Sequence, residues 1–223
     1  MSLSKDLVFL DCERKMPLMK LPIRSVCVQL EGAKIFFSPG STLKKKTLQN
    51  LSAVSDIVAS NLFHCAGIEQ THNLFPEAKI WGPQGVNKTY PEIPWKGFFT
   101  QTPWPYEEDL THIPVLGMPM VRESVFCHKK SRTLLVTDLC FNMQESKGVG
   151  TWIILNLFGT YRRFAISKLF AGAIKDKEAF KKSMDLILQL DFDNLVMSHG
   201  LSIEGRAKDR LVEALKERGL NPD

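Results

Sequence analysis

The sequence predicts an α+β fold in which helices are layered against mixed or antiparallel sheets. Short β-branched and aromatic runs dominate the first two thirds of the chain, with few helices between them, whereas the clearest amphipathic helices come in the last third. The length of 223 residues allows one substantial core, and the hydrophobic share of 44% and charged share of 24% are ordinary for a globular protein. We therefore expect a single domain over residues 1–223, without a disordered or fibrous character.

The first half of the chain is predicted to supply one set of strands. Runs 25–30 and 34–38 flank a glycine-containing connection, which is typical of a β-hairpin. Ser41 or Thr42 can cap a helix that continues to about residue 50. Two short apolar runs that stop at polar or glycine residues are further strand candidates: 56–59 and 78–81. The stretch 87–114 is rich in Pro, Trp and Tyr and has no clear period, so we expect an irregular surface segment.

The second half is predicted to begin with another hairpin and to end in helices. Two strand candidates flank a basic polar turn: 124–128 and 133–137. Residues 151–175 are apolar with interspersed basic residues, and we expect them to be helical in part. Asp176 can cap an amphipathic helix, and 194–197 is the last short strand. The final helix is expected at about 203–218, because Gly219 is a typical helix terminator.

Composition argues against several classes of function. The net charge of +5 comes from scattered basic residues, whereas a nucleic-acid-binding protein would show a continuous basic stripe. None of the cysteines forms a CxxC pair, which argues against a zinc finger or a disulfide framework and favours a reducing compartment: Cys12, Cys27, Cys65, Cys127 and Cys140. The apolar run near the N-terminus is about four residues long, too short for a signal peptide. We therefore expect a cytoplasmic protein without stable membrane anchoring.

Candidate metal ligands follow three of the predicted strands. His64 and Cys65 come after the strand at 56–59, Asp138 ends the second hairpin, and His199 follows the last strand. Residues just past strand ends converge on one edge of layered α/β folds, and imidazole, thiolate and carboxylate groups together suit zinc. Each residue also has an ordinary structural explanation, such as a turn, a cap or a buried thiol. Spacing alone therefore leaves the site open.

The order of these motifs resembles that of the metallo-β-lactamase superfamily. Residues 35–40 are similar to its early strand and turn, and residues 56–67 to the strand that leads into its His-x-His-x-Asp-His loop. Residues 116–118 stand at its Gly-His, residues 134–138 match the strand with the bridging aspartate, and residues 197–200 match the terminal His-Gly. The resemblance covers most of the chain and is to a divergent, uncharacterised branch. It implies a four-layer αββα sandwich.

The resemblance also implies an eroded metal site. Ser60 and Leu62 stand at the first two histidines of the family's first metal position and Met118 at the third, so this position is expected to be lost. The residues that match the second position can all bind one divalent ion, most naturally zinc: His64, Cys65, Asp138 and His199. Asn61 and Glu123 are placed near the expected cleft, as a catalytic base or orienting group. Hydrogen bonds or ion pairs that stabilise a turn are their ordinary alternative.

Three hypotheses about function follow. The first is a metal-dependent hydrolase with a mononuclear site, acting on a small-molecule ester, thioester or phosphoester. The second is a non-catalytic binding or regulatory domain that has lost the metal chemistry. The third is a metal-independent enzyme with Cys65 as nucleophile and His64 or His199 as base. Residues 151–175 would cover the site in the superfamily, and their apolar and basic residues suit an apolar, acidic substrate, a homodimer interface or a membrane surface.

Overall fold

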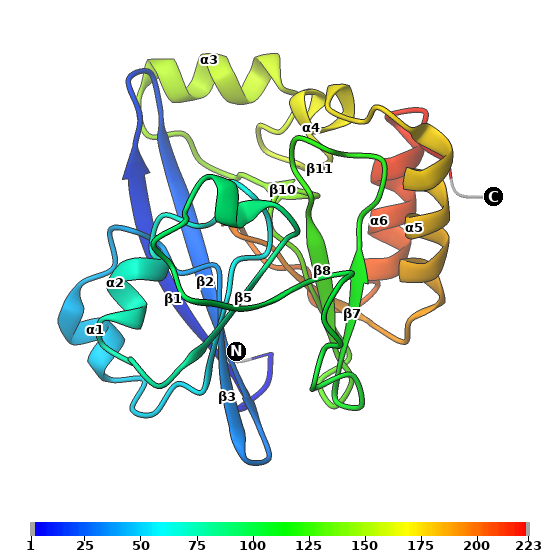
Figure 1. The fold of residues 1–223 in the computed structure, drawn as a ribbon. Coiled ribbons are helices and arrows are strands. Elements are labelled where there is room, and N and C mark those ends of the chain that lie inside the picture. The colour runs from blue at the N-terminus through cyan, green and yellow to red at the C-terminus, as the bar shows by residue number, and fades with distance from the viewer. Residues whose placement is uncertain (1–2, 222–223) are drawn as a thin grey trace.

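The computed structural model describes residues 3–221, whose strands form two large sheets and one small sheet (Figure 1). The six-stranded sheet has the spatial order β1 (Leu7–Lys15), β2 (Lys20–Leu30), β3 (Ala33–Phe37), β4 (Asp56–Val58), β5 (Lys79–Gly82), β6 (Trp95–Phe98). The four-stranded sheet has the order β12 (Asn194–Val196), β9 (Thr133–Leu135), β8 (Ser124–His128), β7 (Leu110–Pro114). The small sheet has the order β11 (Phe164–Ala165), β10 (Phe141–Asn142), β13 (His199–Gly200).

Helices flank the two large sheets (Figure 1). Two short helices and a 3-10 turn belong to the first half of the chain: α1 (Lys45–Gln49), α2 (Ile68–His72) and η1 (Val86–Lys88). Four helices belong to the second half: α3 (Val149–Leu157), α4 (Lys168–Gly172), α5 (Lys177–Gln189) and α6 (Ala207–Lys216). Among residues 3–221, no helix combines the length and the apolar character needed to cross a membrane.

Alternating side chains of the first sheet fill two separate layers of the core. In β3, Phe36 packs in one cluster with Leu48 of α1 and Ile68 of α2, whereas Ile35 and Phe37 pack in another. This alternation follows from the two-residue period of a strand, whose successive side chains point to opposite faces. The helices α1 and α2 therefore cover the outer face of the six-stranded sheet.

The second sheet alternates in the same way. In β8, Val125 and Cys127 join the cluster that contains buried residues of α5 and α6, whereas Phe126 points to the first sheet. The rings of Phe126 and Phe37 meet between the sheets, with their centroids 4.8 Å apart. The layer order is thus α, β, β, α, which confirms the αββα sandwich that the resemblance implied.

Tertiary contacts account for the elements in the first half that the sequence did not predict. The hairpin of β2 and β3 is confirmed, but β2 begins earlier and pairs with the unpredicted strand β1. The stretch 87–114 is less irregular than expected, since it contains η1, β6 and β7. The hydroxyl of Tyr106 in this stretch donates to the buried Asp56 carboxylate at 2.5 Å, and the indole of Trp104 donates to the carbonyl of Leu110. These contacts tie a weakly patterned segment to the core.

The helix expected at 41–50 is shorter, and its predicted cap is wrong. It begins after Lys44 without a side-chain cap, and the hydroxyl of Thr42 donates instead to the carbonyl of Glu13. The predicted cap of α5 is confirmed, because the carboxylate of Asp176 accepts a hydrogen bond from the N–H of Ala179.

The last helix begins four residues later than expected. Ile203 forms a bridge with Leu195 of β12 instead of opening the helix, so α6 begins at Ala207. Gly219 follows the helix with φ +64°, a left-handed conformation that glycine adopts without steric cost and that explains its place as terminator.

Candidate metal centre

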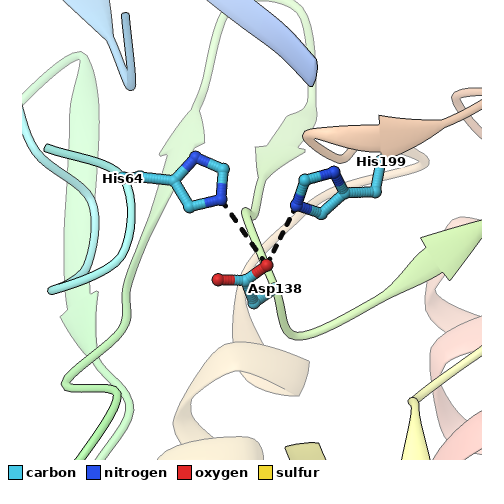
Figure 2. Close-up of side chains that lie close together, drawn as sticks. All are labelled: His64, Asp138 and His199. Atoms are coloured by element: carbon cyan, nitrogen blue, oxygen red, sulfur yellow. Dashed lines mark hydrogen bonds and ion pairs between the residues drawn. The ribbon is translucent and has the colours of Figure 1, made fainter. Parts of the chain in front are cut away.

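Three side chains meet at one end of the sandwich (Figure 2). His64 comes from the loop after β4, Asp138 from the turn after β9, and His199 from β13. Each offers one possible ligand atom, and these atoms lie within 4.8 Å of one another. The Oδ1 atom of Asp138 is 3.0 Å from Nε2 of His199 and 3.5 Å from Nε2 of His64. The structure therefore brings together three of the four predicted ligands.

The separations in this cluster fit a tetrahedral metal site. Bonds of about 2.0–2.1 Å to nitrogen and oxygen place neighbouring ligand atoms of a tetrahedral zinc ion about 3.3 Å apart. Both of the N–O distances in the cluster lie close to this value. An ion bound by all three atoms also needs a similar separation between the two histidine nitrogens, which lie within 4.8 Å of each other.

The hydrogen bond on the far side of His199 fixes which ring nitrogen faces Asp138. Its Nδ1 atom lies 2.8 Å from the carbonyl oxygen of Pro22, and because a carbonyl can only accept, Nδ1 must carry a proton. In a neutral ring, Nε2 then presents a lone pair to the carboxylate at 3.0 Å. Two acceptors at this distance need a cation between them, either a proton or a metal ion. A backbone carbonyl behind the ring is the usual outer partner of a metal-binding histidine.

The ring of Phe141 and the amide of Asn61 hold His199 and Asp138 in place. The ring of Phe141 stacks on His199 with centroids 5.1 Å apart and planes 11° from parallel, as expected from the pairing of these two residues in β10 and β13. The amide nitrogen of Asn61 donates to Oδ2 of Asp138 at 2.7 Å and to the hydroxyl of Thr137 at 3.1 Å. With Oδ2 bound in this way, Oδ1 is the oxygen that faces both histidines.

Asn61 also shapes the loop that carries His64. Its amide oxygen accepts the backbone N–H groups of Phe63 and His64, both at 2.9 Å. This buried side chain therefore connects the loops of two of the three candidate ligands. It lies where the sequence placed an orienting group, and its contacts are those of a positioning residue.

Glu123 is buried beneath the turn that carries Asp138. Its carboxylate accepts the backbone N–H groups of Thr137, Asp138 and Leu139 at 2.8, 2.9 and 3.2 Å. Burial and the nearby charge of Asp138 raise the pKa of Glu123 to about 7, against the opposing effect of the three N–H donors. Because both of its oxygens accept hydrogen bonds from the turn, the structure gives Glu123 the contacts of a turn-stabilising residue instead of a free base.

The two histidines dominate the electrostatics of Asp138. Burial acts to raise the pKa of this carboxyl, but the charge of His64 and the hydrogen bond from His199 outweigh it and hold the pKa well below its ordinary value. Asp138 is therefore a carboxylate at neutral pH, which is the state that a metal ligand requires.

The structure does not bring Cys65 into this cluster. Its thiol lies 3.4 Å from the carbonyl oxygen of Asn61 and 3.7 Å from that of Leu62, and it packs in the apolar cluster beneath α1 and α2. Burial raises the pKa of Cys65 to about 12, so the thiol stays protonated at neutral pH. The geometry therefore departs from the expectation of a fourth ligand, because the side chain of Cys65 points into the core while that of His64 points to Asp138.

The three residues that the sequence aligns with the family's first metal position make contacts of their own. Ser60 is buried and exchanges a hydrogen bond of 2.9 Å with Ser38, and Leu62 packs against the core. Met118 is buried in the cluster that includes α5 and α6. The loss of the first metal position stays a prediction from the sequence.

Sequence reasoning missed the supporting groups around the ligands. The carbonyl of Pro22 acts through the backbone, so no side-chain pattern could have revealed it. Phe141 carried a weak signal, since it is an aromatic residue three positions after Asp138, but its stacking depends on a strand pair between distant segments. Thr137 stands in the predicted strand and becomes relevant only through its contact with Asn61.

Solved structures of metallo-β-lactamases superpose on nearly the whole chain. One from Pontibacter korlensis has 11% sequence identity and a TM-score of 0.68, covering 98% of this chain and 97% of its own. One from Erythrobacter litoralis, with β-mercaptoethanol in its active site, has 13% identity and a TM-score of 0.69, covering 97% and 95%. One from Pseudomonas aeruginosa in a mono-zinc form has 12% identity and a TM-score of 0.66, covering 99% and 95%.

Sequence comparisons add no closer relative. No family model matches the chain, and no curated protein matches it at a significant level. The structural likeness at such low identity shows that the chain has the metallo-β-lactamase fold, in a divergent form.

Proposed function

We propose that this metallo-β-lactamase-like chain is a metal-dependent hydrolase with a mononuclear site held by His64, Asp138 and His199. The observation that supports this proposal most is that the Nε2 atoms of His64 and His199 both face one oxygen of Asp138. In addition, Nδ1 of His199 donates to the carbonyl of Pro22. Three protein ligands leave one coordination position open, which is typical of catalytic zinc. A divalent ion bound there would supply Lewis acidity and lower the pKa of water.

Asn61 and Glu123 position the candidate ligands and take no part in breaking or forming bonds. Asn61 directs Oδ1 of Asp138 toward the ligand cluster, and Glu123 fixes the turn on which Asp138 stands. The alternative of a cysteine-based enzyme has less support, because Cys65 is buried and its thiol donates to the backbone carbonyls of Asn61 and Leu62. A non-catalytic binding domain remains the alternative that the experiment below addresses.

A small molecule is the substrate class that the surroundings favour. A cavity of about 370 Å³ lies beside the loop at 116–119, with Met118, Arg122 and Glu123 among its lining residues; none of the three candidate ligands lines it, and Glu123 is its link to the turn of Asp138. This volume is in the range of sites for small ligands. We propose an ester, thioester or phosphoester as the substrate.

The donor set leaves two metals to compare. Two imidazoles and a carboxylate suit zinc, which we propose, and the same set with open positions is typical of non-haem iron. The metal must therefore be identified by measurement, and zinc, iron and manganese should be quantified together.

Plasma mass spectrometry of protein purified without an affinity tag tests the proposal. We expect about one equivalent of metal in the wild type, none in His199→Ala, and an unchanged amount in Cys65→Ser, because only the histidine lies in the ligand cluster. Loss of metal in Cys65→Ser would instead establish the thiol as a fourth ligand. Wild type without metal, even after incubation with zinc, would leave the non-catalytic binding domain.

Hydrolysis itself is tested on the metal-loaded protein with panels of esters, thioesters and phosphoesters. We expect turnover that a chelator abolishes and the added metal restores, and that His199→Ala lacks. Turnover that survives complete removal of the metal would contradict the metal-dependent mechanism, whereas bound metal without any turnover would favour a binding domain.

A further inference from the structure

Helix α3 presents its apolar side to solvent. Its buried face carries Thr151 and Leu155. Four large apolar residues lie on the opposite face, at the one-turn spacing of a helix, and are largely exposed: Val149, Trp152, Ile153 and Leu157. The helix contains no charged residue. Because a surface helix normally points such side chains inward, this arrangement indicates an interaction surface.

Neighbouring segments extend this apolar surface. Gly150 lies so close to the tip of the hairpin of β1 and β2 that an added Cβ would be 2.2 Å from the carbonyl oxygen of Leu18. The hydroxyl of Thr151 accepts the N–H of Lys20 at 3.0 Å. Figure 1 shows one end of α3 beside the tip of this hairpin and α4 near the opposite end of α3. The helix is thus fixed to the sheet, and its exposed side is not a consequence of loose packing.

The exposed apolar residues of these segments form what we call the α3 ridge: Leu18, Val149, Trp152, Ile153, Leu157 and Leu169. Leu18 is 73% exposed at the hairpin tip. Leu169 belongs to α4, which starts where the N–H of Lys168 donates to the carbonyl of Phe158 at 3.0 Å. The ridge therefore spans three elements, the hairpin tip, α3 and α4, and α3 contacts both of the others.

The chain segments that carry the α3 ridge are strongly basic. Segments 14–24 and 146–175 together contain nine lysines and arginines and no aspartate or glutamate. The whole chain has 29 basic and 24 acidic residues, so the remainder is net acidic. Positive charge is thus concentrated in the parts of the sequence that flank the exposed apolar side chains.

We propose that the α3 ridge docks on the surface of an anionic lipid membrane, a role independent of the proposed hydrolase activity. Exposed aliphatic residues and a tryptophan beside a set of cations are what an interfacial segment requires, since the apolar side chains enter the acyl boundary and the cations meet the headgroups. The docking is peripheral and reversible, because the ridge is short and rests on one face of the domain.

Charge distinguishes this occupant from a second copy of the chain. In a symmetric dimer the same surface meets itself, so the basic residues around the ridge would approach the identical cations of the partner. Three of them pair with carboxylates of the chain, Arg24 with Asp11, Lys147 with Glu13 and Arg163 with Glu217. Within residues 3–221, Lys15, Lys20 and Lys168 form no such ion pair. Their unpaired charges favour a negatively charged surface over a second copy of the chain.

Vesicle sedimentation with the full chain tests the proposal. We expect binding to vesicles of phosphatidylcholine and phosphatidylserine at a ratio of about 7 to 3, release at salt on the order of 0.5 M, and little binding to phosphatidylcholine alone. Trp152 is 48% exposed, Trp81 and Trp104 are buried and Trp95 is partly buried, so a blue shift of the tryptophan fluorescence on binding that Trp152→Gln removes reports the ridge. The double variant Trp152→Gln with Leu157→Gln should weaken binding roughly tenfold or more.

Leu186→Gln provides the matched control, because Leu186 is an exposed leucine on α5, outside the ridge. We expect it to bind vesicles like the wild type, with the metal content of all variants unchanged. The proposal is overturned if the wild type ignores anionic vesicles at low salt or if the double variant binds as well as the wild type. It is also overturned if the wild type is a dimer that the double variant makes monomeric and neither binds vesicles.

Discussion

Asn61 contacts both chain segments that present the ligands of the candidate site. Its amide nitrogen donates to the Asp138 carboxylate, and its amide oxygen accepts the N–H groups at the start of the loop with His64. Since an asparagine is the side chain that donates and accepts at once with this geometry, aspartate or alanine cannot replace both functions. The site thus depends on a residue that never needs to touch the metal.

Replacing Asn61 by alanine should weaken metal binding about 10–100-fold, as is usual when an outer partner of a ligand is removed. We also expect a loss of about 1–3 kcal/mol in the free energy of unfolding, because buried partners lose their hydrogen bonds. Zinc titration and urea unfolding measure the two effects. Asn73→Ala is the matched control, since Asn73 is exposed. An unchanged zinc affinity in Asn61→Ala would contradict the positioning role.

Glu123→Gln tests the second supporting residue by replacing one carboxylate oxygen with an amide nitrogen. A glutamine keeps one acceptor oxygen, but its amide nitrogen would meet either the N–H of Asp138 or those of Thr137 and Leu139. We expect the unfolding free energy of the metal-free protein to fall by about 1–3 kcal/mol, the cost of buried donors without acceptors. Chemical denaturation checks this. A variant as stable as the wild type would show that Glu123 does not hold the turn.

At the scale of elements, the short strand β13 has to pass very close to β10. Gly200 has φ +106°, and a Cβ there would lie 2.1 Å from the carbonyl oxygen of Asn142. Gly200→Ala should therefore displace the strand that carries His199 and lower stability by about 1–3 kcal/mol, with weaker metal binding. Gly205 also has a positive φ, +72°, but open space around it. Gly205→Ala should cost less and leave the metal affinity unchanged, as thermal unfolding and zinc titration can show.

Elements with a clear local pattern were predictable, and elements formed by distant contacts were not. The strand β8 and the amphipathic helix α5 lie where periodicity and capping placed them. In contrast, β6 and β7 arise in a stretch without periodicity, which is held by the contact between Tyr106 and Asp56. Local sequence cannot encode such a pair, because its two members are 50 positions apart.

At the scale of the whole molecule, the order of strands and helices was enough to predict layered α and β elements and the edge where the ligands meet, whereas the four-layer sandwich was implied by the resemblance to the metallo-β-lactamase superfamily. His64, Asp138 and His199 could be predicted because each follows a strand. Cys65 was placed with them for the same reason. It is the next residue after His64, however, and its side chain points into the core instead of toward Asp138. Sequence spacing gives the position of a residue along the chain and not the direction of its side chain.

The core between the two sheets contains the titratable ring of His112, which should make the whole fold sensitive to acid. The ring of His112 in β7 stacks on Phe99 at 4.6 Å and lies 5.1 Å from Phe126, and its Nε2 atom has no hydrogen-bond partner. Burial lowers the pKa of His112 from 6.5 to about 4. Between these pH values the unfolded chain binds a proton that the folded chain does not, so acid favours unfolding.

The expected loss of stability is about 3 kcal/mol as the pH falls from above 6.5 to about 4, since each pKa unit corresponds to about 1.4 kcal/mol. His112→Phe removes this titration and keeps a ring between Phe99 and Phe126, so its unfolding free energy should fall less steeply below pH 6.5 than that of the wild type. Urea unfolding at several pH values measures the slopes, with His72→Gln, in α2 outside this core, as the comparison variant. Equal slopes in the wild type and His112→Phe would mean that other groups, such as the carboxylates, account for the acid sensitivity of the sandwich.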